Sequence, residues 1–186
     1  MGRTEEAVSE MKRAQQLDPL SAEITSYVGL SYYWARKYSL AIEQLQESLE
    51  IDPNFWLPHL LLGWTHLQED KFPQAIAEIQ KAHQLDDNPW PIADLAYAFA
   101  VSEKKNEAQK ILNDLNELSK RRYVSPYFIA RIQVGLGQKE EAFLWLQKAY
   151  ENRDESLTWL KVDPLMDSLR SDSRYADLLR GLGLVF

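Results

Sequence analysis

The chain has 186 residues, 45% of them apolar, and a formal net charge of −7. This length fits one domain or one repeat array, and the negative charge argues against a nucleic-acid ligand, because phosphate binding requires clustered Lys and Arg. Cysteine is absent, which excludes disulfide and thiolate chemistry and fits a reducing, cytoplasmic location. The polar first residues and the lack of a run of ~18 apolar residues predict neither a signal peptide nor a membrane span.

One stretch recurs along the chain. The sequence AIEQLQESLEIDP, residues 41–53, has altered copies that begin at Ala7, Ala75, Ala108 and Ala142. The gaps between successive lead alanines are 34, 34, 33 and 34 residues. A fixed period in this range predicts a repeat array.

Each full repeat is predicted to contain two helices. After a lead alanine, apolar or small residues recur on one helical face, as at Ala41, Leu45, Ser48 and Leu49. Twelve residues before each lead alanine, a small residue follows a large apolar one and would let the two helices approach closely. These pairs are Val28-Gly29, Leu62-Gly63, Leu95-Ala96 and Ile129-Ala130. Helices this short are unstable alone, so stacking must supply the core.

The pattern resembles the tetratricopeptide repeat (TPR) family, in which W-x-x-L-G-x-x-Y, A-x-x-x-F and a final P recur over 34 residues. The resemblance covers roughly residues 2–153 and implies an all-α fold, a right-handed α-solenoid of stacked antiparallel helix pairs. The matching residues are Leu62-Gly63, Tyr32, Ala41 with Leu45, Ala75 with Ile79, Pro19 and Pro53.

In chain order, residues 1–154 form the predicted array. It comprises a half repeat at 1–21 and four repeats at about 22–55, 56–88, 89–122 and 123–154. The half repeat contains one helix at 4–18. The helix pairs are expected at 21–35 and 39–51, 55–69 and 73–86, 89–102 and 105–120, and 124–136 and 139–152.

The start in mid-repeat has two interpretations. The chain is either the C-terminal piece of a longer protein, or its first helix is itself the cap that an array requires. An uncovered face on this helix would invite self-association, so a homodimer through the open N-terminal end is one expectation.

Residues 155–186 break the period and are predicted to cap the array. We expect a helix near 155–160, a short turn at 164–169 and a last helix at 173–180, with start signals at Asp163-Pro164 and Ser171-Asp172-Ser173. The residues expected to seal the end are Trp159, Leu160, Leu165, Leu169, Tyr175, Leu178 and Leu179.

The run from Leu160 to Leu184 resembles the C-terminal ends of bacterial multidomain regulatory TPR proteins. This resemblance implies an alternative function, as the C-terminal sensory or regulatory segment of a larger kinase, nucleotide cyclase or winged-helix transcription regulator.

No catalytic or metal-binding pattern is visible. His59 and His66 lie two helical turns apart, ~10 Å, too far to share one zinc. The sequence lacks the HExxH, P-loop, GxSxG and GxGxxG motifs. We therefore expect no enzyme activity, no metal and no cofactor.

In the TPR family the first helices of the pairs line a concave groove. The corresponding residues here are mainly apolar or aromatic, the composition of a protein-binding surface. They are Leu30, Tyr33, Trp34, Leu57, Leu60, Trp64, Leu67, Trp90, Asp94, Tyr97, Tyr127 and Arg131.

Within this set, Trp64, Tyr97 and Tyr127 are the predicted anchors, because aromatic residues dominate binding hot spots. Arg131, expected near Asp94 and Tyr97, is the predicted polar contact. The alternative is that the stripe forms the core of a tightly wound superhelix, or is covered by the chain's own tail. The sequence thus predicts a non-catalytic scaffold for a protein or peptide partner, with an apolar or amphipathic peptide or helix in the groove.

Overall fold

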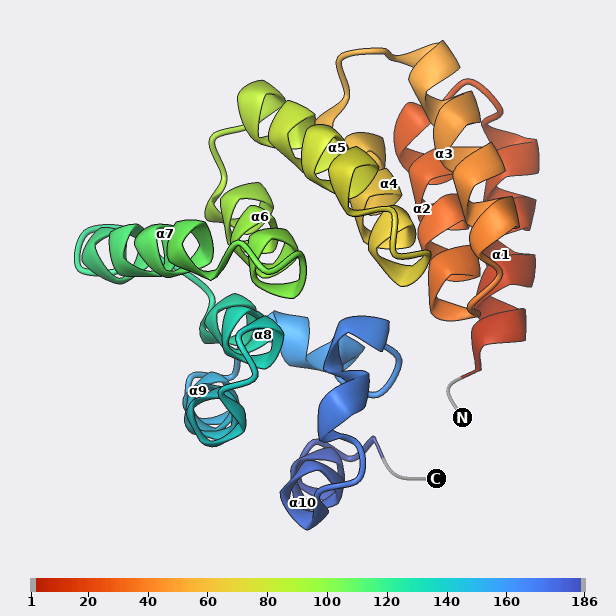
Figure 1. The fold of residues 1–186 in the computed structure, drawn as a ribbon. Helices are drawn as coiled ribbons and strands as arrows, with labels where there is room; N and C mark the ends of the chain where they lie inside the picture. Colours follow the sequence, from red (N-terminus) through yellow and green to blue (C-terminus); the bar gives the residue numbers. More distant parts are fainter. Residues whose placement is uncertain (1–2, 185–186) are drawn as a thin grey trace. The chain divides into compact units, whose positions relative to one another are not determined.

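The computed structural model describes residues 3–184. The outermost two residues of the predicted half repeat and of the predicted cap lie outside this range. The described part is helical without strands (Figure 1), which confirms the all-α prediction. Each predicted helix begins and ends within two residues of its predicted limits, and the turn predicted at 164–169 is a 3₁₀-helix. The α-helices are α1 (Thr4–Leu17), α2 (Ala22–Trp34), α3 (Tyr38–Ile51), α4 (Trp56–Gln68), α5 (Phe72–Leu85), α6 (Pro89–Val101), α7 (Lys105–Leu118), α8 (Pro126–Gly135), α9 (Lys139–Glu151) and α10 (Ser173–Gly181), and the 3₁₀-helices are η1 (Glu155–Trp159) and η2 (Pro164–Leu169).

The chain divides into two compact units, Met1–Pro91 and Ile92–Phe186. The division falls inside α6, not at the 154/155 boundary that the sequence predicts between array and cap. The two divisions describe different things, because a repeat boundary follows the sequence period and a unit follows contacts. The predicted repeat limits and the handedness of the superhelix stay predictions.

In the first unit, helices pack in consecutive pairs, α2 with α3 and α4 with α5. The pairs meet closely at the predicted small residues. A methyl group added to Gly29 would lie 2.7 Å from Leu45 Cγ, and one added to Gly63 would lie 2.4 Å from Ile79 Cγ1. Both distances are shorter than a carbon–carbon contact, so glycine sets the spacing of these pairs.

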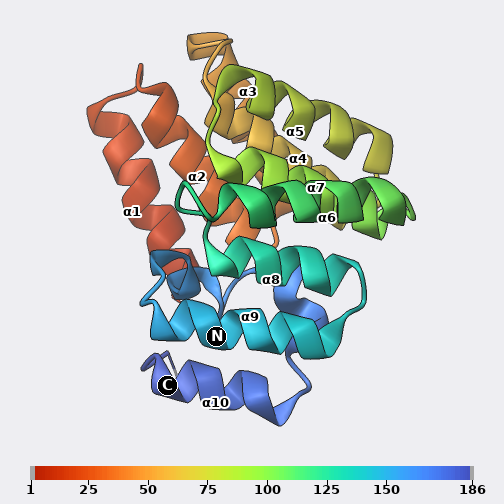
Figure 2. The same cartoon turned by 90° about the vertical axis from the view of Figure 1, so that its left-hand side faces the viewer.

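The second unit contains the pair α8 and α9, followed by the tail. There η2 packs against α8 and α10 against α9, and Figure 2 shows α9 and α10 side by side. The Asp163 carboxylate accepts from the backbone N–H of Leu165 at 2.9 Å, and that of Asp172 from Arg174 at 3.0 Å. Both predicted start signals are therefore N-caps.

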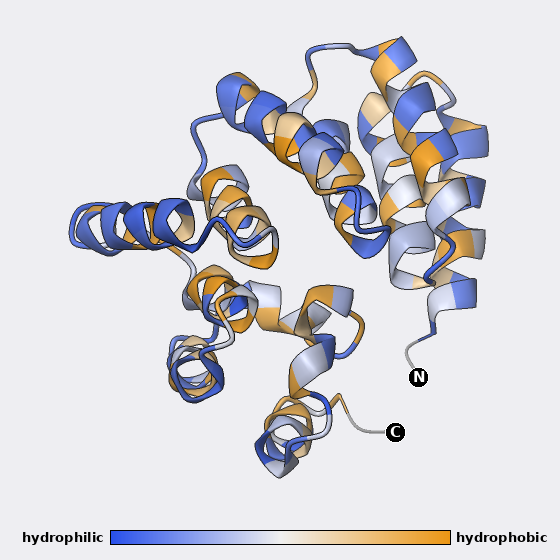
Figure 3. Ribbon diagram, viewed as in Figure 1, coloured by the Kyte–Doolittle hydropathy of each residue, from blue (hydrophilic) through white to orange (hydrophobic). Residues whose placement is uncertain are grey.

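The tail buries most of the residues predicted to seal the array. Leu160, Leu165, Leu169 and Tyr175 are buried, and the Tyr175 hydroxyl donates to the Leu160 carbonyl. The other three, Trp159, Leu178 and Leu179, remain partly exposed. Figure 3 shows α6 and α8 largely apolar and α7 largely polar, which agrees with the mostly buried residues of α6 and α8 and the mostly exposed residues of α7.

The first helix of each pair ends in the same turn. Its left-handed residue is Arg36, Asp70, Glu103 or Gly137, with φ between 56° and 74°. The next backbone N–H donates to the carbonyl five residues earlier, at 2.8–3.0 Å, as from Lys104 to Phe99. This is the Schellman motif. The sequence period is thus repeated in the backbone.

Candidate functional site

An aromatic cluster in the first unit joins α2, α4 and the first residues of α6. Tyr33 of α2, Trp64 of α4 and Trp90 of α6 form a chain of rings, with centroids 5.6 Å apart for the first pair and 5.7 Å for the second. Trp56, at the start of α4, packs edge-on against Trp90 at 5.5 Å. Tyr33 and Trp64 are buried, whereas Trp56 and Trp90 are partly exposed. The Trp56–Trp90 pair therefore presents indole surface on a rigid aromatic base.

The remaining predicted groove residues of this unit belong mostly to the core. Trp34 is partly exposed, and the four leucines of the set are buried: Leu30, Leu57, Leu60 and Leu67. Trp64, the predicted anchor, is 2% exposed. In this conformation these buried side chains offer almost no surface to a ligand.

In the second unit, the predicted groove residues surround a buried cation. Arg131 Nη2 lies 3.2 Å from Asp94 Oδ1, as predicted, and Arg131 Nε lies 3.7 Å from Asp163 Oδ2. The Tyr127 hydroxyl donates to Asp163 Oδ2 at 2.7 Å. Because Asp163 caps η2, these contacts hold the chain's own tail against α8.

Tyr97 and Tyr127, the other two predicted anchors, are 9% and 0% exposed. Tyr127 is covered by the chain's own tail, which is one of the alternatives that the sequence left open for the groove residues. Burial raises the pKa of Tyr127 well above its ordinary value, and the Asp163 carboxylate raises it further while Arg131 opposes both. Burial also raises the pKa of Tyr97. Both phenols are therefore neutral at physiological pH, and Tyr127 acts as a hydrogen-bond donor.

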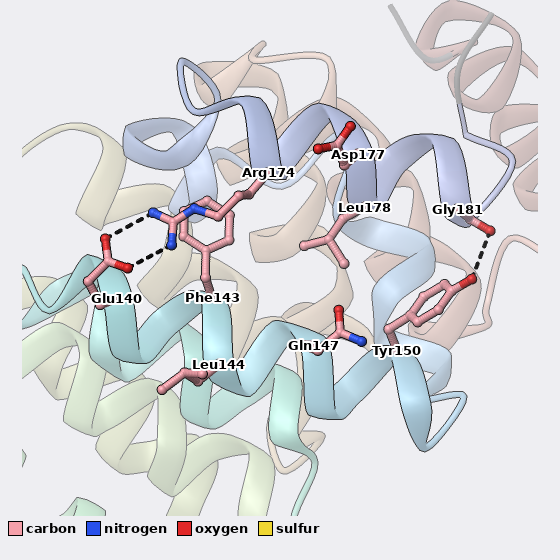
Figure 4. A pocket seen from close by; sticks show the side chains of 9 residues that line it. All are labelled: Glu140, Phe143, Leu144, Gln147, Tyr150, Arg174, Asp177, Leu178 and Gly181. Carbon is pink, nitrogen blue, oxygen red and sulfur yellow. Dashed lines mark hydrogen bonds and ion pairs between the residues drawn. The ribbon is translucent and has the colours of Figure 1, made fainter.

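A cleft that the sequence analysis does not predict lies between α9 and α10 (Figure 4). Its volume is about 500 Å³ and its walls are mainly apolar, with Phe143 and Leu144 from α9 and Leu178 from α10. Tyr150, at the far end of α9, completes this side.

Polar contacts hold the cleft at both ends. At one end, Arg174 forms two hydrogen bonds with Glu140, of 2.7 and 2.9 Å, and its guanidinium lies 4.0 Å from the centre of the Phe143 ring. At the other, the Tyr150 hydroxyl donates to the Gly181 carbonyl at 3.4 Å. The Arg174 hydrogen bonds lower the pKa of the Glu140 carboxyl and, with Lys139, that of Asp172.

Two of the three histidines, His59 and His66, lie beside glutamates. His59 Nδ1 lies 2.6 Å from Glu78 Oε2, and His66 Nδ1 lies 3.8 Å from Glu69 Oε2. Within residues 3–184, no group of three His, Asp or Glu side chains is placed to hold a metal ion. Over the same range, no helix combines the length and the apolar character needed to cross a membrane.

No protein-family model matches the sequence, and no curated protein matches it. Solved structures do. MamA is 20% identical, with a TM-score of 0.55 over 84% of this chain and 92% of that one. YrrB, described as a TPR protein with an unusual peptide-binding site, is 13% identical, with a TM-score of 0.55 over 94% and 91%.

The APC/C complex Cut9–Hcn1 gives a TM-score of 0.65 at 18% identity, over 98% of this chain but only 37% of that one. At these identities the likeness concerns the fold. Together with the repeat period, the paired helices and their shared Schellman turns, it shows that the chain has the tetratricopeptide-repeat fold.

Proposed function

We propose that the protein is a non-catalytic protein-interaction module, and that it binds an amphipathic helix or an extended apolar peptide at the Trp56–Trp90 pair. The observation that carries this proposal is the partial exposure of these two packed indoles. Partly exposed tryptophans on a rigid base are suited to anchor a ligand, because they lose little conformational entropy on binding.

The geometry behind the pair supports the same proposal. Trp90 rests on buried Trp64, which in turn rests on Tyr33, so the exposed rings are held by α2 and α4. A site on packed helices keeps its shape, which reduces the cost of ordering it when a peptide binds. YrrB offers a parallel, as a TPR protein with a peptide-binding site, although the fold alone does not carry function.

Two further expectations belong to this proposal. The cytoplasmic location is supported by the absence of cysteine. The alternative role, in a larger bacterial regulator, is supported only by the resemblance of Leu160–Leu184, and such a segment would also act by binding.

Peptide selection tests the proposal. Peptides of about 15 residues are selected on the full chain from a displayed random library, and their affinities are measured by fluorescence anisotropy. We expect apolar or amphipathic sequences, with Trp56→Ala and Trp90→Ala each weakening binding by about tenfold or more. The matched control is Trp145→Ala, since Trp145 is also partly exposed but lies on α9 beside Lys148. Equal affinity for all three variants and the wild type would rule out this site.

A further inference from the structure

Helix α9 differs from the other four helices that contain a lead alanine, α1, α3, α5 and α7. The residue two positions after the alanine is Leu144 in α9, and it is 63% exposed. Eight positions after the alanine stands Tyr150, which is 39% exposed. The first position holds no large apolar residue in the other helices, and the second holds one only in α3. The counterparts are Ser9, Glu43, Ala77 and Lys110 for Leu144, and Gln15, Leu49, His83 and Asn116 for Tyr150.

These two side chains border hollows. Leu144 and Tyr150 both line the cleft between α9 and α10, of about 500 Å³. Tyr150 also lines a second hollow of about 520 Å³, whose apolar side chains are Leu157, Leu182 and Leu184. An apolar surface therefore runs along α9 and past its end, with the Tyr150 ring between two recesses.

Carboxylates outnumber basic groups around this surface. The linings of the two hollows include Glu140, Asp177, Glu151 and Glu155, all exposed, but only two guanidinium groups. One of these, on Arg174, is engaged by Glu140 and by Asp172. Asp177 pairs with Arg180. At the Tyr150 end, the carboxylates of Glu151, Asp154 and Glu155 stand against one basic group, Arg153, so the acidic excess lies there.

We propose that this surface of α9 and α10 binds a basic amphipathic helix from a partner protein, in a way that is independent of the Trp56–Trp90 site. A small apolar molecule in the cleft would contact Leu144 and Tyr150 but would leave the second hollow, with Leu157, Leu182 and Leu184, uncovered. A polypeptide segment would cover both hollows and fill them with its own side chains. Its lysine or arginine residues would face Glu151 and Glu155.

The dimensions suit such a helix. Phe143 and Tyr150 are seven residues apart on α9, which is two turns or ~10 Å. A bound helix with apolar residues at i, i+3 or i+4, and i+7 spans the same distance and presents one apolar face to the surface. Arg174 and the Tyr150–Gly181 hydrogen bond hold α10 in place at both ends, so the recess exists before binding.

The probes are three synthetic 15-residue peptides. One has leucines on a single helical face and lysines elsewhere, the second replaces the lysines with glutamates, and the third is a shuffled lysine version without an apolar face. Binding to the full chain is followed by ¹H–¹⁵N NMR and anisotropy. We expect the first peptide alone to shift amides of α9 and α10, and these shifts to weaken as salt rises.

Matched variants locate the site. Leu144→Ser is expected to weaken binding about tenfold by removing apolar contact, whereas Leu40→Ser, at another exposed leucine, is expected to change nothing. Glu151→Lys is expected to weaken binding about two- to fivefold. Its control is Glu47→Lys on α3, because Gln44 donates to Glu47 as Gln147 donates to Glu151.

Several results would overturn the inference. They are equal shifts of the α9 and α10 amides with the acidic or the shuffled peptide, amide shifts confined to α1–α5, and a Leu144→Ser variant that binds as the wild type does. Since Leu144 is exposed, this variant is expected to keep the wild-type melting temperature. Loss of binding in Trp90→Ala with Leu144→Ser unaffected would support the proposed function and reject this second site.

Discussion

At the scale of single residues, Tyr127 links burial to pH. Its folded-state pKa is raised above 10.0, first by burial and then by Asp163. The folded state therefore keeps a phenolic proton that the unfolded state loses near pH 10. The resulting stability is complete below pH 10 and declines as pH rises toward the folded-state pKa, with a limiting slope of about 1.4 kcal/mol per pH unit.

We predict that Tyr127→Phe removes this pH dependence. At pH 7 the variant should lose about 1–2 kcal/mol, because Asp163 loses a buried donor. Above pH 10 the difference between variant and wild type should narrow, since the wild type alone loses the stability described above. Urea unfolding at pH 8, 10 and 11 measures the free energy of unfolding of both proteins. A difference between them that stays constant over this range would contradict the prediction.

The left-handed turn residues give a second prediction at this scale. Glu103 has a φ of 63° and holds the position that Gly137 fills in the last repeat. A side chain there is strained and glycine is not, so Glu103→Gly should stabilise the protein by about 1 kcal/mol. Glu103→Ala removes the same charge but keeps Cβ, and should stay within about 0.5 kcal/mol of the wild type. Equal unfolding midpoints for both variants would show that φ is not the cause.

At the scale of elements, Arg131 links α8, α6 and η2. Its guanidinium is fully buried between Asp94 and Asp163. Arg131→Met should cost about 3–5 kcal/mol, because two buried carboxylates would lose their counter-charge. The rate of amide hydrogen exchange should then rise most in η2, the shortest of the three elements.

A second substitution separates charge from packing. Asp94→Asn in the Arg131→Met background removes one uncompensated carboxylate and should recover part of the lost stability. If the double variant were no more stable than Arg131→Met, the loss would come from packing of the arginine stem and not from the ion pairs.

The elements themselves were predictable from the sequence, because the period fixes each helix pair and caps such as Asp163 and Asp172 fix the starts. Helix α8 begins at Pro126, two residues after its predicted start, since proline suits the first helical position. Asp163 illustrates what the sequence could not provide. It reads as an N-cap, but its contacts with Tyr127 and Arg131 fall outside the repeat period.

The cleft between α9 and α10 could not be predicted from the sequence either. Its signal in the sequence is the apolar character of Leu144 and Tyr150 at positions that are mostly polar in the other repeats. That signal says the positions are unusual, but the space between α9 and α10 depends on how closely α10 packs. Burial of Trp64 and Tyr97 could not be predicted for a similar reason, because the sequence pattern of an apolar helical face is the same whether that face is buried or exposed.

At the scale of the whole molecule, α1 leaves a face uncovered. The lead alanine Ala7 is exposed, whereas its counterparts Ala41, Ala75, Ala108 and Ala142 are fully buried. Met11 is partly exposed, and its counterpart Leu45 is fully buried. Self-association through α1, which the sequence suggests, would use this face.

We predict that such a dimer is weak. One helix offers much less than the ~800 Å² per partner of a stable interface, so association should be detectable only at high protein concentration. Sedimentation equilibrium over a hundredfold concentration range measures it, with Met11→Lys expected to abolish it and Glu43→Lys as control. A dimer that is tight, or that Met11→Lys leaves intact, would place the contact elsewhere.

The central claim is that the partly exposed indoles of the first unit contact a peptide ligand. Fluorine NMR of the chain labelled with 5-fluorotryptophan tests it directly, because the six tryptophans give six signals that single substitutions assign. On titration with a selected peptide, the signals of Trp56 and Trp90 are expected to shift, and that of Trp145 to stay in place. Shifts of Trp145 or Trp159 with Trp56 and Trp90 unchanged would contradict the claim.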